Sequence, residues 1–577
     1  MISYWQFVIL YLVIDWQYLY IGLFVIMKIF RIKKSFYIVF LLTLIGGFLH
    51  FYNLNWGAPF YFHPDERNIA NAVSQLRFST QMNPHFFAYG SLPIYTIYFT
   101  GIAVNYFSQW INQASPTSLQ TVTFEQAIMI SRIYSAILAT LLIPLLFFLG
   151  KKLQNATVGL LSVFFATFCV GFIQFAHFGT FEMWLTFFGV LLFLSFLHVL
   201  EKKTRINILL SALLFGTLVA IKITSLALLP IPLILIPILV FRNTSKKLHA
   251  LHALKEILFF LIIAALVYLF TNPYVVFDAK DFLSSMHYES GVAFGTLPVF
   301  YTENFLDTTP IIYQFLHIYP FLLNPLATLL FIPAGIYLFI IAVKQKNSQF
   351  LLLAAFFLIL FLSQAVLFVK WTRYLVPTIP FIILINSLAL TKLIKAGRHF
   401  ARLLALEIAL LCILTGVFAY AYFATAFVAI DPRLMAVVFA QQTIPLNAHI
   451  LTEPADLGIL PFQEAFPHID TFNFYGLDTH PPAATVTQLR QKIALAQYII
   501  LPSQRILQSR IQNPKQFPKG HAFYQSLLNG KLGFHKIYQT PCDIFCRIAY
   551  LGDPVYWWEQ TVSVFDHPTV FIFKKNN

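Results

Sequence analysis

Two adjacent carboxylates, Asp65 and Glu66, follow His63 and Pro64 shortly after a hydrophobic segment that covers residues 35–51. Ionisable side chains beside a membrane are costly unless they have a task. Pro64 suits the first turn of a helix, and consecutive helical positions point about 100° apart, so the two carboxylates cannot serve one site equally. We predict that Asp65 is a catalytic base and that Glu66 pairs with an arginine or with the group that Asp65 deprotonates.

Several basic residues lie in segments that the topology described below places outside the membrane, where cations are disfavoured. A cation held at a lipid boundary suits an anionic ligand, and a lipid phosphate or pyrophosphate is the obvious candidate. We assign this role to Lys222 and Arg373, and we group Lys370 and Arg132 with them. The alternative for each cation is an ion pair with an acidic neighbour or extension toward lipid headgroups.

A third acidic residue, Glu182, lies in the short turn 177–182 between two hydrophobic segments and is held close to the membrane. A base that deprotonates a hydroxyl and cations that stabilise a departing phosphate are the groups that glycosyl transfer from a lipid phosphate requires. No general acid is needed, because phosphate is already a good leaving group. His63, Tyr89 and Tyr288 could line such a site, although a membrane-interface belt explains the tyrosines equally well.

The composition places these residues in a polytopic membrane protein. The 577-residue chain is 59% hydrophobic and 11% charged, and its mean hydropathy is +0.73. Its apolar runs of about 20 residues match the length of a membrane-spanning helix. A net charge of +15 would suggest a nucleic-acid partner for a soluble protein, but here Lys and Arg form short clusters between apolar runs. These clusters report the topology instead, and we expect no nucleic-acid partner.

The basic clusters orient a membrane domain that comprises residues 28–429. If the clusters are cytoplasmic, an even number of crossings separates each from the next, which gives an all-α bundle of about 11–12 transmembrane helices. Asp65 then lies on the outer face, in a long external loop that covers residues 53–124. Residues 91–111 of this loop are apolar and aromatic, but parity indicates that they lie along the outer interface or re-enter.

Two regions flank this domain. Residues 1–27 are either an extra spanning helix or a segment ahead of the true translation start, which would then be Met27. Residues 430–577 are more polar and long enough to form a domain, which we expect to be an extracytoplasmic α/β domain. Its strands are expected at 449–452, 497–501 and 569–573, and its helices at 487–494 and 521–529. Cys542 and Cys546 form either a local disulfide or two free thiols.

These stretches occur in an order that resembles the C-type glycosyltransferase superfamily. The likeness is to its bacterial phospholipid-carrier-dependent enzymes, which are related to protein O-mannosyltransferases and to the aminoarabinose transferase of lipid A. It extends from about residue 35 to the C-terminus. The matching stretches are residues 62–66, 83–93, 177–182, the segment around Lys222, residues 272–274, residues 370–377 and the closing motif 564–568.

The resemblance implies an inverting transfer from a polyprenyl-phosphate-linked sugar at the outer face of the cytoplasmic membrane. It implies that Asp65 activates the acceptor hydroxyl and that Glu182 is the second acidic residue near the donor. Lys222 and Arg373 would bind the carrier phosphate. The acceptor, whether glycan, lipid or protein, stays open. Many relatives have Asp where Glu182 stands, and Trp371 replaces a proline.

Three other interpretations remain. No metal cofactor is expected, although His63, His85 and His177 could form a divalent-metal site with Asp65. A lipid or sugar transporter or flippase without catalysis is disfavoured because the apolar helices contain almost no internal charge, whereas the coupling residues of transporters lie near mid-membrane. A non-catalytic member of the superfamily, whose C-terminal domain only binds glycans, is the third.

Overall fold

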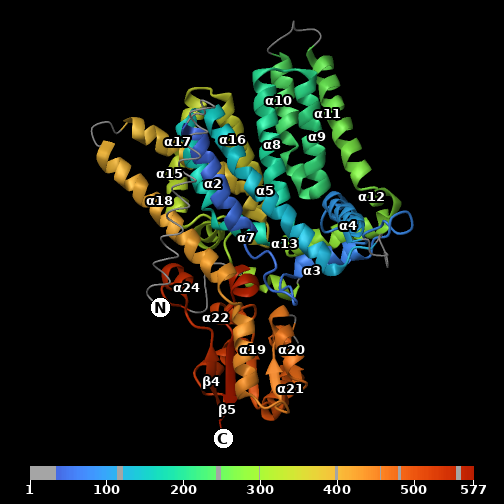
Figure 1. Ribbon diagram of the computed structural model, residues 1–577, viewed down its shortest axis with the longest axis vertical. Helices are drawn as coiled ribbons and strands as arrows, with labels where there is room; N and C mark the ends of the chain where they lie inside the picture. The colour runs from blue at the N-terminus through green and yellow to red at the C-terminus, as the bar shows by residue number, and fades with distance from the viewer. Residues whose placement is uncertain are drawn as a thin grey trace.

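The computed structural model describes residues 34–576 except 113–120, 242–248, 298, 397–400, 455, 479–481 and 554–560. The possible spanning helix at residues 1–27 lies outside the described residues. Figure 1 shows a bundle of long helices and, below it, a smaller unit of strands and helices. The smaller unit is the C-terminal domain, which follows α18 (Ala401–Phe423) and the turn η6 (Ala424–Val428).

Nine helices among the described residues are long and apolar enough to cross a membrane. A tenth candidate is the bent pair α6 (Ala156–Thr167) and α7 (Val170–His177), whose halves meet at 51°, and the shorter apolar helix α9 (Arg205–Ile221) brings the set to eleven. This set confirms the prediction of a polytopic, all-α membrane domain. The nine are α2 (Lys34–Phe51), α5 (Phe124–Leu153), α8 (Glu182–Glu201), η1 (Ile223–Leu228) with α10 (Pro230–Phe241), α11 (His249–Thr271), α15 (Pro325–Lys344), α16 (Ser348–Ala365), η4 (Thr372–Thr378) with α17 (Ile379–Ala396), and α18 with η6.

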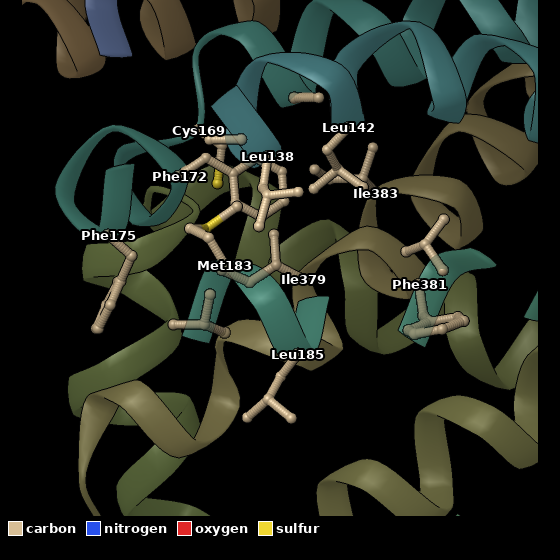
Figure 2. Close-up of a cluster of buried hydrophobic side chains, with 14 of the residues drawn as sticks. Leu138, Leu142, Cys169, Phe172, Phe175, Met183, Leu185, Ile379, Phe381 and Ile383 are labelled. Atoms are coloured by element: carbon tan, nitrogen blue, oxygen red, sulfur yellow. The ribbon is translucent and has the colours of Figure 1, made fainter. Parts of the chain in front are cut away.

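Figure 2 shows part of the bundle core, where side chains of α5, α7, α8 and α17 meet. Leu138 and Leu142 of α5, Phe172 of α7, Met183 of α8 and Ile379 of α17 are all buried. Lipid chains are as apolar as these side chains, so close packing between the helices holds such a core together. The core therefore fixes the ends of α8 and α17, which lie next to the polar groups of the candidate site.

A layer of further helices covers the end of the bundle that faces the C-terminal domain (Figure 1). It consists of α3 (Pro64–Ser74), α4 (Ser91–Asn112), α12 (Tyr274–Phe277), α13 (Ala279–Phe294) and η2 (Phe300–Phe305). In Figure 1 the bundle helices run from top to bottom, whereas α4 is seen almost along its axis, so α4 lies across the bundle. Phe107 and Trp110 of α4 are exposed, which is typical of a helix at a membrane interface. This arrangement agrees with the prediction that residues 91–111 do not cross.

The C-terminal domain contains a five-stranded sheet in the order β2-β1-β3-β5-β4. β1 (Ile450–Thr452) is parallel to β2 (Ile469–Thr471) and β3 (Tyr498–Leu501), whereas β5 (Phe571–Lys575) is antiparallel to β3 and β4 (Phe534–Gln539). The three predicted strands correspond to β1, β3 and β5. The two predicted helices correspond to α21 (Pro482–Leu495) and α23 (Pro518–Leu528). β2 and β4 escaped prediction because they lie at the sheet edges and bury few side chains.

A short helix of the C-terminal domain, α24 (Ile544–Ala549), is packed into the bundle. Its residue Phe545 contacts the rings of Phe321 and Tyr422, at centroid distances of 6.2 and 5.5 Å. A disulfide joins Cys542 to Cys546 at the start of this helix, which decides between the two alternatives that the sequence left open. The domain is therefore anchored to the bundle, and its loops can take part in a site at the junction.

Candidate active site

Asp65 lies in the first turn of α3, where His63 is the N-cap residue and Pro64 follows it. A carboxylate is favoured there because the N-terminal end of the helix dipole is positive. Asp65 forms an ion pair with Arg373 of η4, and the two side chains remain 22% and 27% exposed. The Nε atom of Arg373 is buried and has no hydrogen-bond partner among the described residues. The predicted base and one predicted phosphate ligand are therefore in direct contact.

Glu66 points away from Asp65 and into the protein. Its carboxylate accepts hydrogen bonds from Nε and Nη2 of Arg132 at 2.8 and 2.7 Å, and it also accepts one from the backbone N–H of Gly179. Both side chains of this ion pair are fully buried. The neighbouring carboxylates diverge as helical geometry predicts, and Glu66 is the one that pairs with a buried arginine.

Arg132 is committed to this internal network. Its Nη1 atom donates to the carbonyl oxygens of Leu54 and Trp56 at 2.7 and 2.9 Å, and its guanidinium lies 4.7 Å from the centroid of the Trp56 ring. A fully buried guanidinium with these partners cannot reach a ligand, so we remove Arg132 from the phosphate-binding group. Of the two partners predicted for Glu66, the structure shows the arginine, so we assign Glu66 a structural role and not a catalytic one.

Lys222 directly follows α9 and lies between aromatic rings. Its Nζ atom is 4.9 Å from the ring centroid of Tyr89 and 4.7 Å from that of Tyr374. Within the described ranges, Nζ has neither a hydrogen-bond acceptor nor a carboxylate at ion-pair distance. The ring of Tyr374 also lies 5.6 Å from the guanidinium of Arg373, so both cations flank one ring. Aromatic faces attract the ammonium but leave its charge available to an anion.

The chain before α4 approaches α9 closely enough to bring Tyr89 beside Lys222. The N–H of Gly90 donates to the carbonyl oxygen of Ile221 at 2.9 Å. A Cβ atom at position 90 would lie 1.8 Å from the carbonyl oxygen of Ala220, which is far inside a normal contact. Only glycine permits this approach, so Gly90 helps to build the aromatic surroundings of Lys222.

Glu182 is the first residue of α8 and is buried. The hydroxyl of Tyr89 lies 3.4 Å from its Oε1 atom, and its Oε2 atom has no hydrogen-bond partner in the part of the chain that the structure describes. Glu182 also interacts electrostatically with Lys222. Glu182 is therefore close to a predicted phosphate ligand.

Lys370 and Tyr288 lie at the margin of this group. Nζ of Lys370 donates to the carbonyl oxygen of Phe368 at 2.8 Å, and burial lowers the pKa of Lys370 to about 8. Tyr288 is exposed, and its hydroxyl lies 2.8 Å from that of Tyr301. The ring of Tyr301 lies 6.3 Å from that of Trp371. Both residues are therefore next to the segment that leads into η4.

Phe565 of the C-terminal domain covers the start of α3. The rings of Phe565 and Phe178 each lie 4.6 Å from the imidazole of His63. Burial and the nearby positive charges, that of Arg373 first, hold the pKa of His63 well below its usual range, so its ring is neutral. Arg433 donates to the carbonyl oxygen of Phe565 at 2.7 Å. His63 is thus a packed contact between the two domains, and it does not line an open surface as predicted.

A small hollow opens beside Tyr89, between the chain before α4, the end of α9 and α13. Most of its lining is apolar and includes Ile223, Val275, Phe282 and Met286. Tyr89, whose ring faces Nζ of Lys222 at 4.9 Å, connects this apolar surface to the cation.

One group of metal-ligand type occurs among the described residues. The ligand atoms of His85, Asp278 and Asp281 all lie within 4.8 Å of one another and could hold a divalent ion. Asp65 is not part of this group. In the alternative metal site around Asp65, both ring nitrogens of His177 contact backbone carbonyl oxygens, at 2.7 and 2.8 Å, so this imidazole already has partners.

No protein-family model and no curated protein matches the sequence. Among solved structures, the chain is similar to the archaeal oligosaccharyltransferase AglB from Archaeoglobus fulgidus in complex with an inhibitory peptide and a dolichol-phosphate. The TM-score is 0.53 at 12% identity, over 95% of this chain and 89% of that chain. This protein has the fold of AglB. The apo form of the Archaeoglobus enzyme gives a TM-score of 0.50 at 12% identity, over 95% and 89% of the two chains.

ArnT from Cupriavidus metallidurans, bound to undecaprenyl phosphate, aligns over 94% of this chain and 98% of that chain at 12% identity, with a TM-score of 0.45. At such identities the likeness to AglB shows the fold alone. It confirms the predicted resemblance to the membrane C-type glycosyltransferases at that level.

Three contributions to the site were missed in the sequence. Tyr374 is adjacent in sequence to Arg373, a predicted phosphate ligand, so it could have been proposed as a site residue on that ground. Phe565 belongs to the closing motif 564–568, but nothing local connects that motif to His63. Glu289 of α13 could not be distinguished from other outer carboxylates, because its neighbours come from distant segments.

Proposed function

We propose that this protein is an inverting membrane glycosyltransferase that moves a sugar from a polyprenyl-phosphate carrier to an acceptor hydroxyl. The observation that carries the proposal is the meeting of one carboxylate and two cations: Asp65 pairs with Arg373, and Tyr374 separates Arg373 from Lys222. A base beside a phosphate-binding pair is what this reaction requires. The likeness to AglB, whose structure holds a dolichol-phosphate, supports a carrier of this class.

In the proposed reaction, Asp65 takes the proton of the acceptor hydroxyl as the acceptor oxygen bonds to the anomeric carbon. The bond from that carbon to the phosphate oxygen breaks, and its electron pair moves to the phosphate. A single displacement of this kind inverts the anomeric configuration. The products are the glycosylated acceptor, polyprenyl phosphate and a protonated Asp65, which returns its proton to water.

Lys222 and Arg373 act mainly as the phosphate departs. The donor phosphodiester has one negative charge, whereas the released monoester has about two near pH 7, because its second pKa is about 6. Cations whose attraction grows as this charge develops lower the barrier and do more than tighten binding. The Nε atom of Arg373 is unused within the described residues and can donate to a phosphate oxygen. Lys370 is a third cation at the margin of the same site.

The remaining parts of the site suit the rest of the donor. The hollow beside Tyr89 offers an apolar surface to the first isoprene units of the carrier. Glu182, close to Lys222 and with Oε2 free of partners in the described part of the chain, is placed to accept a hydrogen bond from the sugar.

The proposed location is the cytoplasmic membrane, with the active site and the C-terminal domain on the extracytoplasmic side. The positive-inside rule supports this orientation. The Cys542–Cys546 disulfide supports it independently, because disulfides persist in oxidising compartments. Phe565 packs on His63, so the C-terminal domain and Asp65 lie on the same side.

A deletion strain and the purified protein test the proposal. Mass spectrometry of the deletion strain should find one sugar missing from a cell-envelope glycan and its polyprenyl-linked donor accumulating. In lipid nanodiscs, Lys222→Met should bind undecaprenyl phosphate about tenfold or more weakly, because a charge-assisted contact is lost. Lys280→Met, which removes an exposed cation of α13, is the control and should bind normally.

Two results would contradict the proposal. One is a deletion strain with unchanged glycans and unchanged lipid-linked sugars. The other is undiminished carrier binding by the Lys222→Met variant. A transporter would move the carrier across a vesicle membrane without breaking the bond between sugar and phosphate, so release of polyprenyl phosphate distinguishes the two functions.

A further inference from the structure

One face of α13 runs along the candidate site. Phe282 and Met286 on this face line the apolar hollow, and the carbonyl oxygen of Ala293 accepts a hydrogen bond from the N–H of Phe368 at 3.0 Å. Positions 282, 286, 289 and 293 follow one another at intervals of four, three and four, which is the spacing of a single helix face. Glu289 therefore lies between the hollow and the segment that leads to η4.

Glu289 is half-buried, and its carboxylate has no hydrogen bond and no ion pair within the described residues. Burial raises the pKa of Glu289, and the charge of Lys222 opposes this shift. The same carboxylate interacts electrostatically with the hydroxyls of Tyr89 and Tyr301. A carboxylate that is partly withdrawn from water and lacks a protein partner is available to a ligand.

The charge of Glu289 limits what that ligand can present. A phosphate would be repelled, so the atoms that approach Glu289 must be hydrogen-bond donors. In a polyprenyl-phosphate-linked sugar, only the sugar carries such donors, which are its hydroxyl groups and, in an amino sugar, its amino or acetamido group. Tyrosine rings next to the carboxylate suit the apolar faces of a sugar ring.

We propose that Glu289 accepts hydrogen bonds from hydroxyl groups of the donor sugar and is a specificity-determining residue of this site. The inference rests on the proposed function and extends it, because it places the sugar between Lys222 and α13. The phosphate then lies toward Lys222 and Arg373, and the sugar hydroxyls point toward Glu289. Tyr301 provides the adjoining wall.

Two ligands that differ only by the sugar separate this role from a structural one. They are undecaprenyl phosphate and undecaprenyl phosphate bearing a hexose, chosen as the tightest binder among the mannosyl, glucosyl and galactosyl forms. Glu289→Gln removes a negative charge close to Lys222, so the bare carrier should bind as tightly as before or more tightly. The hexosyl carrier loses a charge-assisted hydrogen bond and should bind roughly tenfold more weakly. A loosened site would weaken both ligands.

Asp307→Asn is the control, because it removes one negative charge from an exposed position just after η2 that belongs to no part of the candidate site. It should leave both affinities unchanged, and Lys222→Met should weaken both. The inference is overturned if Glu289→Gln weakens the two ligands equally, if it leaves hexosyl-carrier binding unchanged, or if no hexose alters the affinity of the wild-type protein. A wild-type protein that does not bind bare undecaprenyl phosphate would overturn the proposed function itself.

Discussion

Asp65 and Glu66 offer a pair of matched substitutions with opposite expected effects. Asp65→Asn and Glu66→Gln each replace a carboxylate by an amide of nearly the same shape, at successive positions of α3. We propose that Asp65 is the general base of the reaction and that Glu66 stabilises the folded protein. Asp65→Asn should therefore abolish transfer in a protein of near-normal stability, and Glu66→Gln should lower the free energy of unfolding.

The expected magnitudes follow from the surroundings of the two ion pairs. Both side chains of the Glu66–Arg132 pair are 0% exposed, so loss of the negative charge leaves a buried guanidinium uncompensated, at a cost of about 3–5 kcal/mol. The side chains of the Asp65–Arg373 pair are 22% and 27% exposed. Loss of this partly exposed pair should therefore cost less than that, closer to the about 0–1 kcal/mol of a solvent-exposed pair. Loss of a general base lowers the rate by about 10²–10⁴-fold.

Two measurements separate the variants. Equilibrium unfolding of the purified proteins in mixed micelles of increasing SDS content reports stability, and recovery of the missing glycan in the deletion strain reports transfer. Arg132→Met should resemble Glu66→Gln in unfolding, because it breaks the same pair. The assignment is refuted if Asp65→Asn restores the glycan at close to the wild-type level, or if Glu66→Gln unfolds at the wild-type SDS fraction.

Two further predictions concern Lys370, at the edge of the candidate site, and the contact between the C-terminal domain and the bundle. Burial lowers the pKa of Lys370 to about 8, whereas an unfolded lysine titrates near 10.4. Between these two pKa values the folded state binds fewer protons than the unfolded state, so the free energy of unfolding should rise with pH across this range. In pH-dependent unfolding, Lys370→Met should reduce that rise, and an identical profile for the two proteins would contradict the prediction. Asp566 of the C-terminal domain accepts hydrogen bonds from Gln174 at 3.0 Å and from Tyr422, both in the bundle. Asp566→Ala removes the acceptor for both buried donors, which costs about 1–3 kcal/mol for each. Proteases should therefore release the domain faster from this variant. Asp470→Ala, at an exposed position of β2, is the control. Equal digestion rates for both variants would contradict the prediction that Asp566 holds the C-terminal domain against the bundle.

Local physics made several features predictable. The divergence of Asp65 and Glu66 depends only on helical periodicity after Pro64, and the structure has that helix start. The apolar segments were predictable from length and hydropathy. Parity of the crossings predicts that residues 91–111 do not span the membrane, although they are almost as apolar as a spanning helix, and α4 lies across the bundle in agreement with this.

Long-range packing decided what the sequence could not. Arg132 and Lys222 are both cations that the predicted topology places on the unexpected side of the membrane, and no local feature separates them. In the structure Arg132 is covered by the chain around Trp56, whereas Nζ of Lys222 lies between two aromatic rings and has no hydrogen bond or ion pair within the described ranges. Glu289 is an ordinary carboxylate in the sequence. It gains significance only because α13 is folded against the loops that hold Lys222 and Arg373.

The two arginine–carboxylate pairs at the start of α3 have the same chemistry, but their burial makes them suited to different tasks. Arg132 cannot exchange Glu66 for a ligand without leaving a charge buried, and a penalty of about 3–5 kcal/mol makes that pair a fixed support. Arg373 can be drawn from Asp65 toward a phosphate for about 1 kcal/mol or less, which a single charge-assisted hydrogen bond of about 1.5–3 kcal/mol offsets. In the proposed reaction, a donor phosphate can therefore compete for Arg373 and leave Asp65 facing the acceptor, while Glu66, one residue away, keeps the helix in place.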